Sequence, residues 1–247
     1  LKILNSIAGY ADILELGFPV IEDAAHAIDS TYNGLPCGTI GDVGIFSFDA
    51  VKNLTVGEGG GIAAKDPIKI ERAKVMRYCG IGKSGFDSAI NNSNTKSRWW
   101  EYNIQEPFIK MLPTNLAANI GLAQLNKKKE ILYKKKKVFL SYKKRLRNTP
   151  IRFLEEIKDT KSSYWQIIIF VKNNKIRDEL SKFLERKKIE TRTSFPPVHT
   201  MPMHKLSKKN YLLNAKILSK TGICLPSSAS LEEKDINYVC TQIKNFF

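Results

Sequence analysis

The sequence lacks long apolar runs, and this absence argues against a membrane-spanning or secreted protein. No apolar run approaches the roughly 20 residues that a membrane-spanning helix needs. The first five residues, LKILN, do not show the order of charge, apolar block and small-residue cleavage site that marks a signal peptide. We therefore predict a cytoplasmic protein without a membrane span.

Patterned cysteines and histidines are also lacking. The four cysteines are widely spaced and form no C-x-x-C pair, and the three histidines form no H-x-x-x-H or H-E-x-x-H motif. Zinc sites and disulfide frameworks in small secreted domains both depend on such spacing. The sequence therefore predicts free thiols and no metal site.

Acidic residues are scarce relative to basic ones, with 24 Asp and Glu against 40 Lys and Arg and a net charge of +16. Clustered cations can bind nucleic acid by displacing counterions from its phosphates. However, residues 127–147 hold eleven basic residues and one acidic residue, and apolar residues recur there at helical intervals. This pattern predicts an amphipathic helix with a solvated basic face and no specific nucleic-acid partner.

Elsewhere the pattern predicts an α/β chain. We expect a short buried strand at residues 18–21 that leads to Glu22 and Asp23, and further strands at 43–48, 60–64 and 165–171. We expect helices at 68–78, 176–186 and 231–246, and one long basic helix from about Pro113 to a break near 148–150. Residues 1–16 read as the end of a helix, and residues 84–97 as a polar loop.

Two segments carry the chemistry of the sequence. Lys52 lies beside a glycine-rich turn, where partial desolvation can lower the pKa of an amine. Asp23 follows a predicted strand, at the kind of strand end where open α/β sheets bind ligands. A pyridoxal phosphate (PLP) enzyme needs a lysine for its Schiff base and an aspartate for the pyridine nitrogen. Taken alone, the lysine is more typical of a surface ion pair, and the aspartate can be a helix N-cap.

Several motifs, in the same order along the chain, resemble the DegT/DnrJ/EryC1/StrS family of sugar aminotransferases. The matching segments are 21–27 (IEDAAHA), 41–48 (GDVGIFSF), 52–55 (KNLT) with 57–60 (GEGG), 115–125 (NLAANIGLAQL), 188–192 (KIETR) with 195–199 (FPPVH), and 225–228 (LPSS) with 235–239 (DINYV). The resemblance implies a fold-type I PLP-dependent transferase. Its large domain is partial, with a mostly parallel sheet, and a smaller α+β C-terminal domain follows.

The resemblance also implies domain boundaries and an incomplete start. Residues 1–112 would form the C-terminal part of the large PLP-binding domain, 113–148 a long interdomain helix, and 149–247 the small domain. The sequence has no initiator methionine and begins about halfway through the family's large domain. We therefore expect a chain truncated at its amino end, with an incomplete sheet and exposed apolar edges.

Roles for individual residues follow from the resemblance. It implies that Lys52 is catalytic and carries PLP, that Asp23 pairs with the pyridine nitrogen, and that His26 lies near the cofactor's 3′-oxygen. Ser47 matches a phosphate-contacting serine, and Asn53 would order the turn beside the cofactor. The segment 108–113 departs from the family's Gly-Tyr-Asn-Tyr-Arg-Met pattern. Lys110 there falls where relatives reach the cofactor phosphate of a neighbouring subunit.

The implied activity is transfer of an amino group, with glutamate as the expected donor, to a nucleotide-linked keto-deoxysugar by a homodimer. The products of such enzymes enter surface polysaccharides and other glycoconjugates. Two alternatives stay open: a PLP-dependent sugar dehydratase, and an inactive remnant or basic binding protein. A few dehydratases of this fold carry histidine in place of the lysine, so Lys52 favours transamination. Neither the nucleotide sugar nor the choice between carbon 3 and carbon 4 follows from the sequence.

Overall fold

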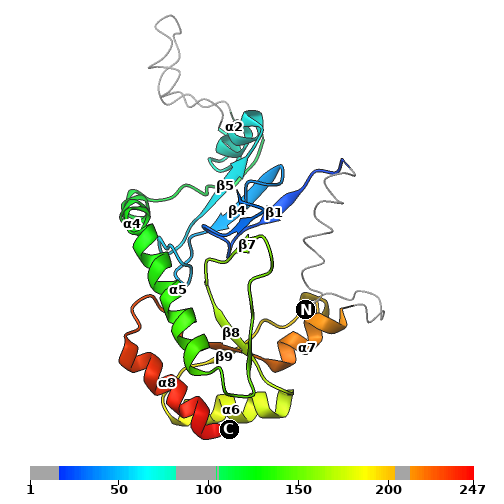
Figure 1. The fold of residues 1–247 in the computed structure, drawn as a ribbon. Coiled ribbons are helices and arrows are strands. Elements are labelled where there is room, and N and C mark those ends of the chain that lie inside the picture. The colour runs from blue at the N-terminus through cyan, green and yellow to red at the C-terminus, as the bar shows by residue number, and fades with distance from the viewer. Residues whose placement is uncertain (1–16, 82–103, 105, 204–211) are drawn as a thin grey trace, which may run out of the picture. The chain divides into compact units, whose positions relative to one another are not determined.

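The computed structural model describes residues 17–81, 104, 106–203 and 212–247 (Figure 1). The chain divides into two compact units. The N-terminal unit comprises Pro19–Ile28 and the described residues of Pro36–Leu125, and the C-terminal unit comprises Gly17, Phe18, Asp29–Leu35 and the described residues of Asn126–Phe247. The helix end expected at residues 1–16 and the loop expected at 84–97 lie outside the described residues. The domain boundaries expected from the sequence stay a prediction.

The N-terminal unit contains a three-stranded sheet in the order β1-β4-β5. Strand β1 (Ile21–Asp23) pairs in parallel with β4 (Val43–Ser47), whereas β5 (Gly60–Ala64) pairs with β4 in the antiparallel direction. The α/β fold class is confirmed, but the described sheet is mixed rather than mostly parallel. Residues 48–59 contain no helix, so β5 returns antiparallel without the crossover that a parallel pair needs.

Apolar side chains of this sheet remain exposed, as expected for its edges. Ile21 of β1 is 67% exposed and Ile62 of β5 is 56% exposed. The strand expected to be buried at residues 18–21 is wrong in both position and burial, since β1 begins only at Ile21 and Phe18 is 65% exposed. In the described sheet β1 is an edge strand with β4 as its only neighbour, so its side chains receive little cover.

Helix α2 (Pro67–Met76) follows β5 and packs against it. Asp66 caps the helix by accepting a hydrogen bond from the Ile68 amide at 2.9 Å, and Pro67 occupies the first turn, where a missing amide hydrogen costs nothing. The helix predicted at 68–78 is therefore confirmed, with its first residue one position earlier and its end at Met76.

The single long helix expected after Pro113 is wrong, because the structure has two helices there. Helix α4 (Asn115–Asn126) and helix α5 (Lys128–Arg145) are separated by Lys127, whose φ of −95° and ψ of 2° lie outside helical values. Asn126, just before the break, is a weak helix former whose side chain competes for backbone hydrogen bonds. The amphipathic character predicted for α5 is confirmed by buried Val138, Phe139 and Tyr142.

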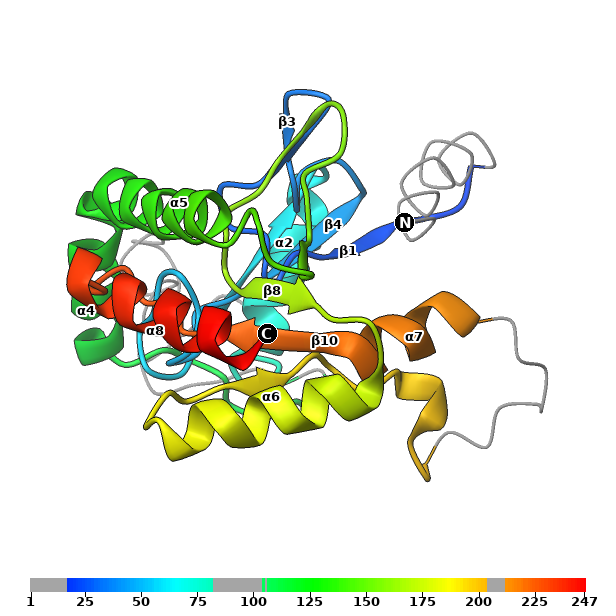
Figure 2. The ribbon, with the colours of Figure 1, turned by 60° about the horizontal axis from the view of Figure 1, so that its bottom comes forward.

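The C-terminal unit contains an antiparallel sheet with strand order β6-β8-β10-β9. Helix α8 packs against both α5 and α6 and lies between them, as Figure 2 shows. The strand and the two helices predicted here are confirmed as β8, α6 and α8. The elements of this unit are β6 (Arg152–Phe153), β8 (Ile167–Phe170), α6 (Asn174–Arg186), β9 (Arg192–Thr193), the 3-10 helix η2 (Val198–Thr200), α7 (Leu213–Thr221), β10 (Gly222–Leu225) and α8 (Glu233–Phe246).

Three short strands form a third sheet in the order β3-β2-β7. They are β2 (Thr31–Tyr32), β3 (Leu35–Pro36) and β7 (Thr160–Lys161), and the pairing of Thr31 with Lys161 joins segments far apart in the sequence. Strand pairs of only two residues leave little trace in a sequence pattern. None of these strands was expected from the sequence.

The hydrophobic core lies in the C-terminal unit, where α5, β8, α6, β10 and α8 bury their apolar faces together. Its central members are Val138, Phe139, Tyr142, Leu146, Ile167, Ile169, Leu180, Leu184, Ile223, Leu225, Ile236, Val239, Cys240 and Ile243. In the part of the chain that the structure describes, no helix combines the length and the apolar character that crossing a membrane requires.

Candidate functional site

The edge of the N-terminal sheet brings two of the predicted site residues to the same side. Because β1 and β4 are parallel, their carboxyl ends meet at one edge. Asp23 is the last residue of β1 and Ser47 the last of β4, and Asp23 lies opposite Ile45, two residues before Ser47. A carboxylate and a hydroxyl therefore stand at neighbouring strand ends.

The chain turns immediately after Asp23. The amide of Ala24 donates to the carbonyl of Ile45 at 2.9 Å, and the amide of Ala25 donates to the Asp23 carboxylate at 3.1 Å. Turns, not a helix, occupy the residues that follow, so the alternative reading of Asp23 as a helix N-cap is wrong. The Asp23 side chain is exposed at this strand end, where its second oxygen can face a ligand.

Lys52 lies in the turn that connects β4 with β5. Its amide donates to the carbonyl of Asp49 at 3.0 Å, and Ser47 accepts a hydrogen bond from the Asp49 amide through its hydroxyl at 3.3 Å. The next two residues anchor the turn, because Asn53 is 8% exposed and Leu54 is 3% exposed. The turn therefore holds Lys52 half-buried, close in sequence to an anchored segment.

Electrostatic coupling joins three of the predicted residues. Burial lowers the pKa of His26 below its ordinary value, the positive charge of Lys52 lowers it further, and the carboxylate of Asp23 raises it. His26 therefore experiences the charges of both Lys52 and Asp23. The structure brings an amine, an imidazole and a carboxylate into one neighbourhood, next to the strand end that carries Ser47.

Lys110 is not linked to this group by any interaction among the described residues. Its side chain is exposed, and its backbone pairs with Tyr78 just beyond α2. The neighbouring amide of Met111 donates to the carbonyl of Arg77 at 2.7 Å. Within the described part of the chain, no hydrogen bond or ion pair connects Lys110 with Asp23, His26 or Lys52.

Glu22 is a residue of this site that sequence reasoning missed. Its carboxylate accepts hydrogen bonds from the amides of Gly38 at 2.7 Å and of Ile40 and Gly41 at 2.6 Å each. Hydrogen bonds from amides to an ionised acceptor are among the stronger ones in proteins. Glu22 thus fixes the loop that leads into β4 against the strand that ends at Asp23.

The same loop packs closely on β4. Gly38 has a φ of +87°, which favours glycine, and a side-chain carbon on Gly44 would lie 1.8 Å from the Gly38 carbonyl oxygen. A side-chain carbon on Gly38 would meet the ring of Phe46. A signal was present in the sequence, since an acidic residue at a strand end precedes a loop rich in glycine. It gave no information about which amides the carboxylate would bind.

Among the residues that the structure describes, no group of three or more His, Cys, Asp or Glu side chains could hold a metal ion. All four cysteines are free thiols, with Cys224 and Cys240 buried and Cys37 and Cys79 half-buried.

Curated relatives share most of this chain but extend well beyond it. GDP-perosamine synthase from Escherichia coli O157:H7 is 34% identical over 232 residues, which cover 92% of this chain and 58% of that protein. A dTDP-4-dehydro-2,3,6-trideoxy-D-glucose 4-aminotransferase from Saccharopolyspora spinosa is 29% identical over 236 residues, which cover 93% of this chain and 59% of that protein. The chain thus spans less than two thirds of the length of these relatives.

Solved structures share the fold. The aminotransferase TlmJ from Streptoalloteichus hindustanus superimposes with a TM-score of 0.83 and 26% identity, covering 94% of this chain and 59% of that one. A putative sugar aminotransferase from Streptococcus pneumoniae in its PMP form gives a TM-score of 0.82 at 26% identity, covering 93% and 59%, and a PLP form of it is also known. The sequence model of the DegT/DnrJ/EryC1/StrS aminotransferases matches residues 4–244. This chain therefore belongs to the DegT/DnrJ/EryC1/StrS aminotransferase family.

Proposed function

We propose that this chain is the catalytic-lysine portion of a PLP-dependent aminotransferase that acts on a nucleotide-linked keto sugar. One observation carries the proposal: His26 is coupled electrostatically to both Lys52 and Asp23, in a chain of a family whose relatives are named as sugar aminotransferases. The amino group would come from an amino acid, with glutamate as the expected donor.

The residues at the sheet edge fit PLP by their chemistry. A cofactor with an aldehyde, a basic ring nitrogen, a phenolic oxygen and a phosphate needs an amine, a carboxylate and hydrogen-bond donors from the protein. Lys52 offers the amine, Asp23 the carboxylate, and His26 and Ser47 the polar hydrogens. The carboxylate and the hydroxyl lie at one sheet edge, and Lys52 and Asp23 both act on His26.

Membership of the family suggests a role for each residue. Lys52 would attach to PLP through its amine and then, once released, carry a proton between cofactor and substrate carbon atoms. Asp23 would keep the pyridine nitrogen protonated, and Ser47 would donate to the phosphate. Asn53, buried beside Lys52, would order the turn. When bound, PLP supplies an electrophilic carbon and a ring that accepts electron density.

The lowered pKa of His26 suits this arrangement. A neutral imidazole can donate or accept a hydrogen bond without adding a second positive charge beside Lys52. His26 would then contribute by orienting neighbouring groups through hydrogen bonds. Glu22 would keep the strand end of Asp23 in register with β4.

The remaining expectations are part of the same proposal. Lys110 would contact the cofactor phosphate of a second subunit, which requires a homodimer. The domain division near residues 112 and 148 and the cytoplasmic location also remain proposals. The relatives act, by their names, on GDP-linked and dTDP-linked sugars, so a nucleotide-linked keto sugar is the substrate class that we propose here.

Product analysis tests the reaction. The protein would be incubated with PLP, glutamate and a panel of GDP-, dTDP- and UDP-linked 4-keto and 3-keto sugars. We expect 2-oxoglutarate to form together with a sugar nucleotide whose mass matches replacement of the keto oxygen by an amino group. Loss of water from the sugar without glutamate consumption would instead show the dehydratase. Failure of every sugar, with no PLP bound, would show a remnant without catalytic function.

A further inference from the structure

The outward side of helix α5 carries a row of basic and apolar side chains. Successive members are three or four residues apart, so they occupy one side of the helix. The members of this row are Lys129, Tyr133, Lys136, Leu140, Lys144 and, just past the helix end, Arg147, and all six are exposed. At about 1.5 Å per residue the row is roughly 27 Å long.

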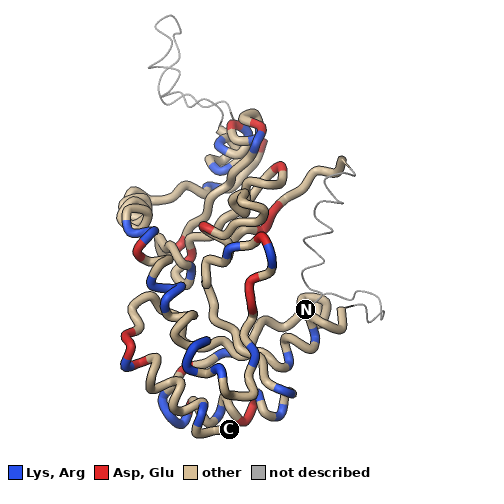
Figure 3. The backbone as a smooth tube through the Cα atoms, in the orientation of Figure 1, with Lys and Arg blue, Asp and Glu red and all other residues tan. Residues whose placement is uncertain are grey.

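The acidic residues near α5 lie beside other cations. Lys128 pairs with Asp29 at 2.9 Å, Lys134 with Glu130 at 2.6 Å and Lys143 with Glu155 at 2.8 Å. Arg145 pairs with Glu233. By contrast, none of the four cations of the row makes an ion pair within the described part of the chain, so the row keeps its full positive charge. Figure 3 shows basic residues along α5.

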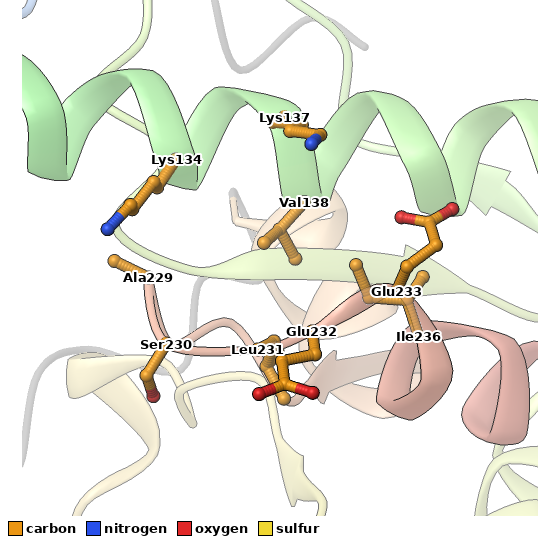
Figure 4. Close-up of a pocket in the computed structure, with 9 residues that line it drawn as sticks. All are labelled: Lys134, Lys137, Val138, Ala229, Ser230, Leu231, Glu232, Glu233 and Ile236. Carbon is orange, nitrogen blue, oxygen red and sulfur yellow. The ribbon is translucent and has the colours of Figure 1, made fainter.

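A cavity of about 350 Å³ lies beside this row, between α5 and the start of α8 (Figure 4). Lys134 and Lys137 line it from α5, and Glu232 and Glu233 line it from the start of α8. The hydrogen bond and charge of Arg145 lower the pKa of Glu233, and the hydrogen bond from Ser141 and the charge of Lys137 lower it further. Lys137 lines this cavity together with the carboxylates of Glu232 and Glu233, so it is not counted in the row.

The two apolar members distinguish this row from a solvated charged face. Tyr133 is 70% exposed and Leu140 is 48% exposed, and they alternate with the cations along the row. Nucleic-acid phosphates are satisfied by cations alone and gain nothing from an exposed leucine. A lipid surface attracts lysine through its anionic headgroups and accepts leucine and tyrosine at the depth of the headgroups.

We propose that this row docks the protein on an anionic lipid surface, with the cations at the headgroups and Tyr133 and Leu140 inserted between them. The match is one of charge and of shape, since a straight row on one side of a helix can contact a flat surface along its whole length. The binding is peripheral and weak, as expected from electrostatic attraction supported by two apolar side chains. It does not depend on the proposed aminotransferase activity.

Vesicle flotation tests the docking. The full chain would be mixed with vesicles of phosphatidylcholine, with and without phosphatidylglycerol as the anionic lipid, at about 0.1 M salt. We expect flotation only with the anionic vesicles. The variant K129Q/K136Q/K144Q/R147Q should bind these vesicles at least about 10-fold more weakly, because each cation near an anionic surface contributes about a factor of five before screening.

Matched control variants distinguish the effect of this row from the effect of the protein's net charge. The control K172Q/K175Q/K182Q/K244Q removes four exposed lysines outside the row and should retain most of the binding. The variant Y133S/L140S should lose vesicle binding about 5-fold but keep its affinity for double-stranded DNA. The exposed pair L154S/V198S provides its control. Far-UV circular dichroism and unfolding midpoints would confirm that each variant is folded.

Three results would overturn the docking proposal. Equal flotation with neutral and anionic vesicles would remove the role of charge. Equal loss in the two four-site variants would assign binding to net charge rather than to this row. Binding to DNA that is tighter than to anionic vesicles, and unchanged vesicle binding in Y133S/L140S, would assign the row to nucleic acid.

Discussion

The ammonium group of Lys135 donates a hydrogen bond to the backbone carbonyl of Trp165 at 2.9 Å inside the C-terminal unit. Lys135 is only 8% exposed, although it belongs to the most basic stretch of the sequence. Burial lowers its pKa from the ordinary 10.5 to about 8. The same Trp165 carbonyl also accepts from the Ser227 hydroxyl at 3.3 Å, so it does not depend on Lys135 alone.

Stability should therefore rise with pH between about 8 and 10.5. In this range the unfolded chain, whose Lys135 has its ordinary pKa, binds more protons than the folded chain, so deprotonation favours folding. Below about pH 8 the cost of burying the charge is fully present, at up to about 3 kcal/mol. The variant Lys135→Met should be more stable at neutral pH by about 1–3 kcal/mol and should lose this dependence.

Urea unfolding at about pH 7 and about pH 10 measures both effects. The exposed neighbour Lys136 supplies the control, since Lys136→Met should change neither the stability nor its pH dependence by much. A Lys135→Met variant that is less stable than the parent at both pH values would show that the hydrogen bond to Trp165 outweighs the burial cost.

Tyr142 provides a second test of the same core. Its side chain is fully buried, burial raises the pKa of its hydroxyl, and the hydroxyl has no hydrogen-bond partner in the described part of the chain. Because an unpaired buried hydroxyl is costly, Tyr142→Phe should be neutral or stabilising by about 1 kcal/mol. Tyr142→Ala should cost about 3–5 kcal/mol through the cavity it leaves. A loss above about 1 kcal/mol for Tyr142→Phe would reveal a partner for the hydroxyl.

The hydrogen bonds of the Glu22 carboxylate predict that its substitution loosens the loop near the site. In Glu22→Gln an amide nitrogen replaces one of the two oxygens that accept from Gly38, Ile40 and Gly41, which places a donor against a donor. We expect a loss of about 1–3 kcal/mol and faster hydrogen exchange of those three amides. The exposed Glu58→Gln serves as control. Unchanged hydrogen exchange at the three amides would show that Glu22 does not hold the loop that leads into β4.

The electrostatic coupling at His26 predicts that two variants shift the His26 pKa in opposite directions. Lys52→Met should raise the His26 pKa, since the Lys52 charge lowers it, and Asp23→Asn should lower it further, since the carboxylate raises it. NMR titration of the imidazole signals measures both. Lys65→Met, whose side chain donates to the carbonyl of Ile40, should leave the value unchanged. Equal His26 pKa values in the parent protein and the three variants would show that neither Lys52 nor Asp23 acts on His26. The proposed site would then lose its support.

Local patterns predicted part of the regular structure, because helical and strand periodicity is encoded by neighbouring residues. Strands β4 and β5 and helix α2 were recognisable for this reason. The pairing of Thr31 with Lys161 was not, since it depends on contacts between distant segments. Nor could the pattern show that Lys135, one lysine among many, faces inward.

Some site residues were likewise predictable from the sequence, whereas others required the folded structure. Lys52, Asp23, His26 and Ser47 were identified by motif, and the structure places Asp23 and Ser47 at one sheet edge and couples His26 to Lys52 and Asp23. The role of Glu22 depends on which amides its carboxylate meets, and this requires the folded loop. Lys110 was chosen by alignment with a family motif, and its proposed contact requires a second subunit.

The absorbance spectrum of the protein mixed with PLP tests the central claim most directly. The full chain and its Lys52→Ala variant would each be measured before and after addition of glutamate, with Lys65→Ala as a control for general loss of lysine. We predict a visible band that requires Lys52, survives in Lys65→Ala and disappears with glutamate. A band of equal strength in the Lys52→Ala variant, or no band in any of the three proteins, would contradict the assignment of Lys52 as the residue that holds PLP.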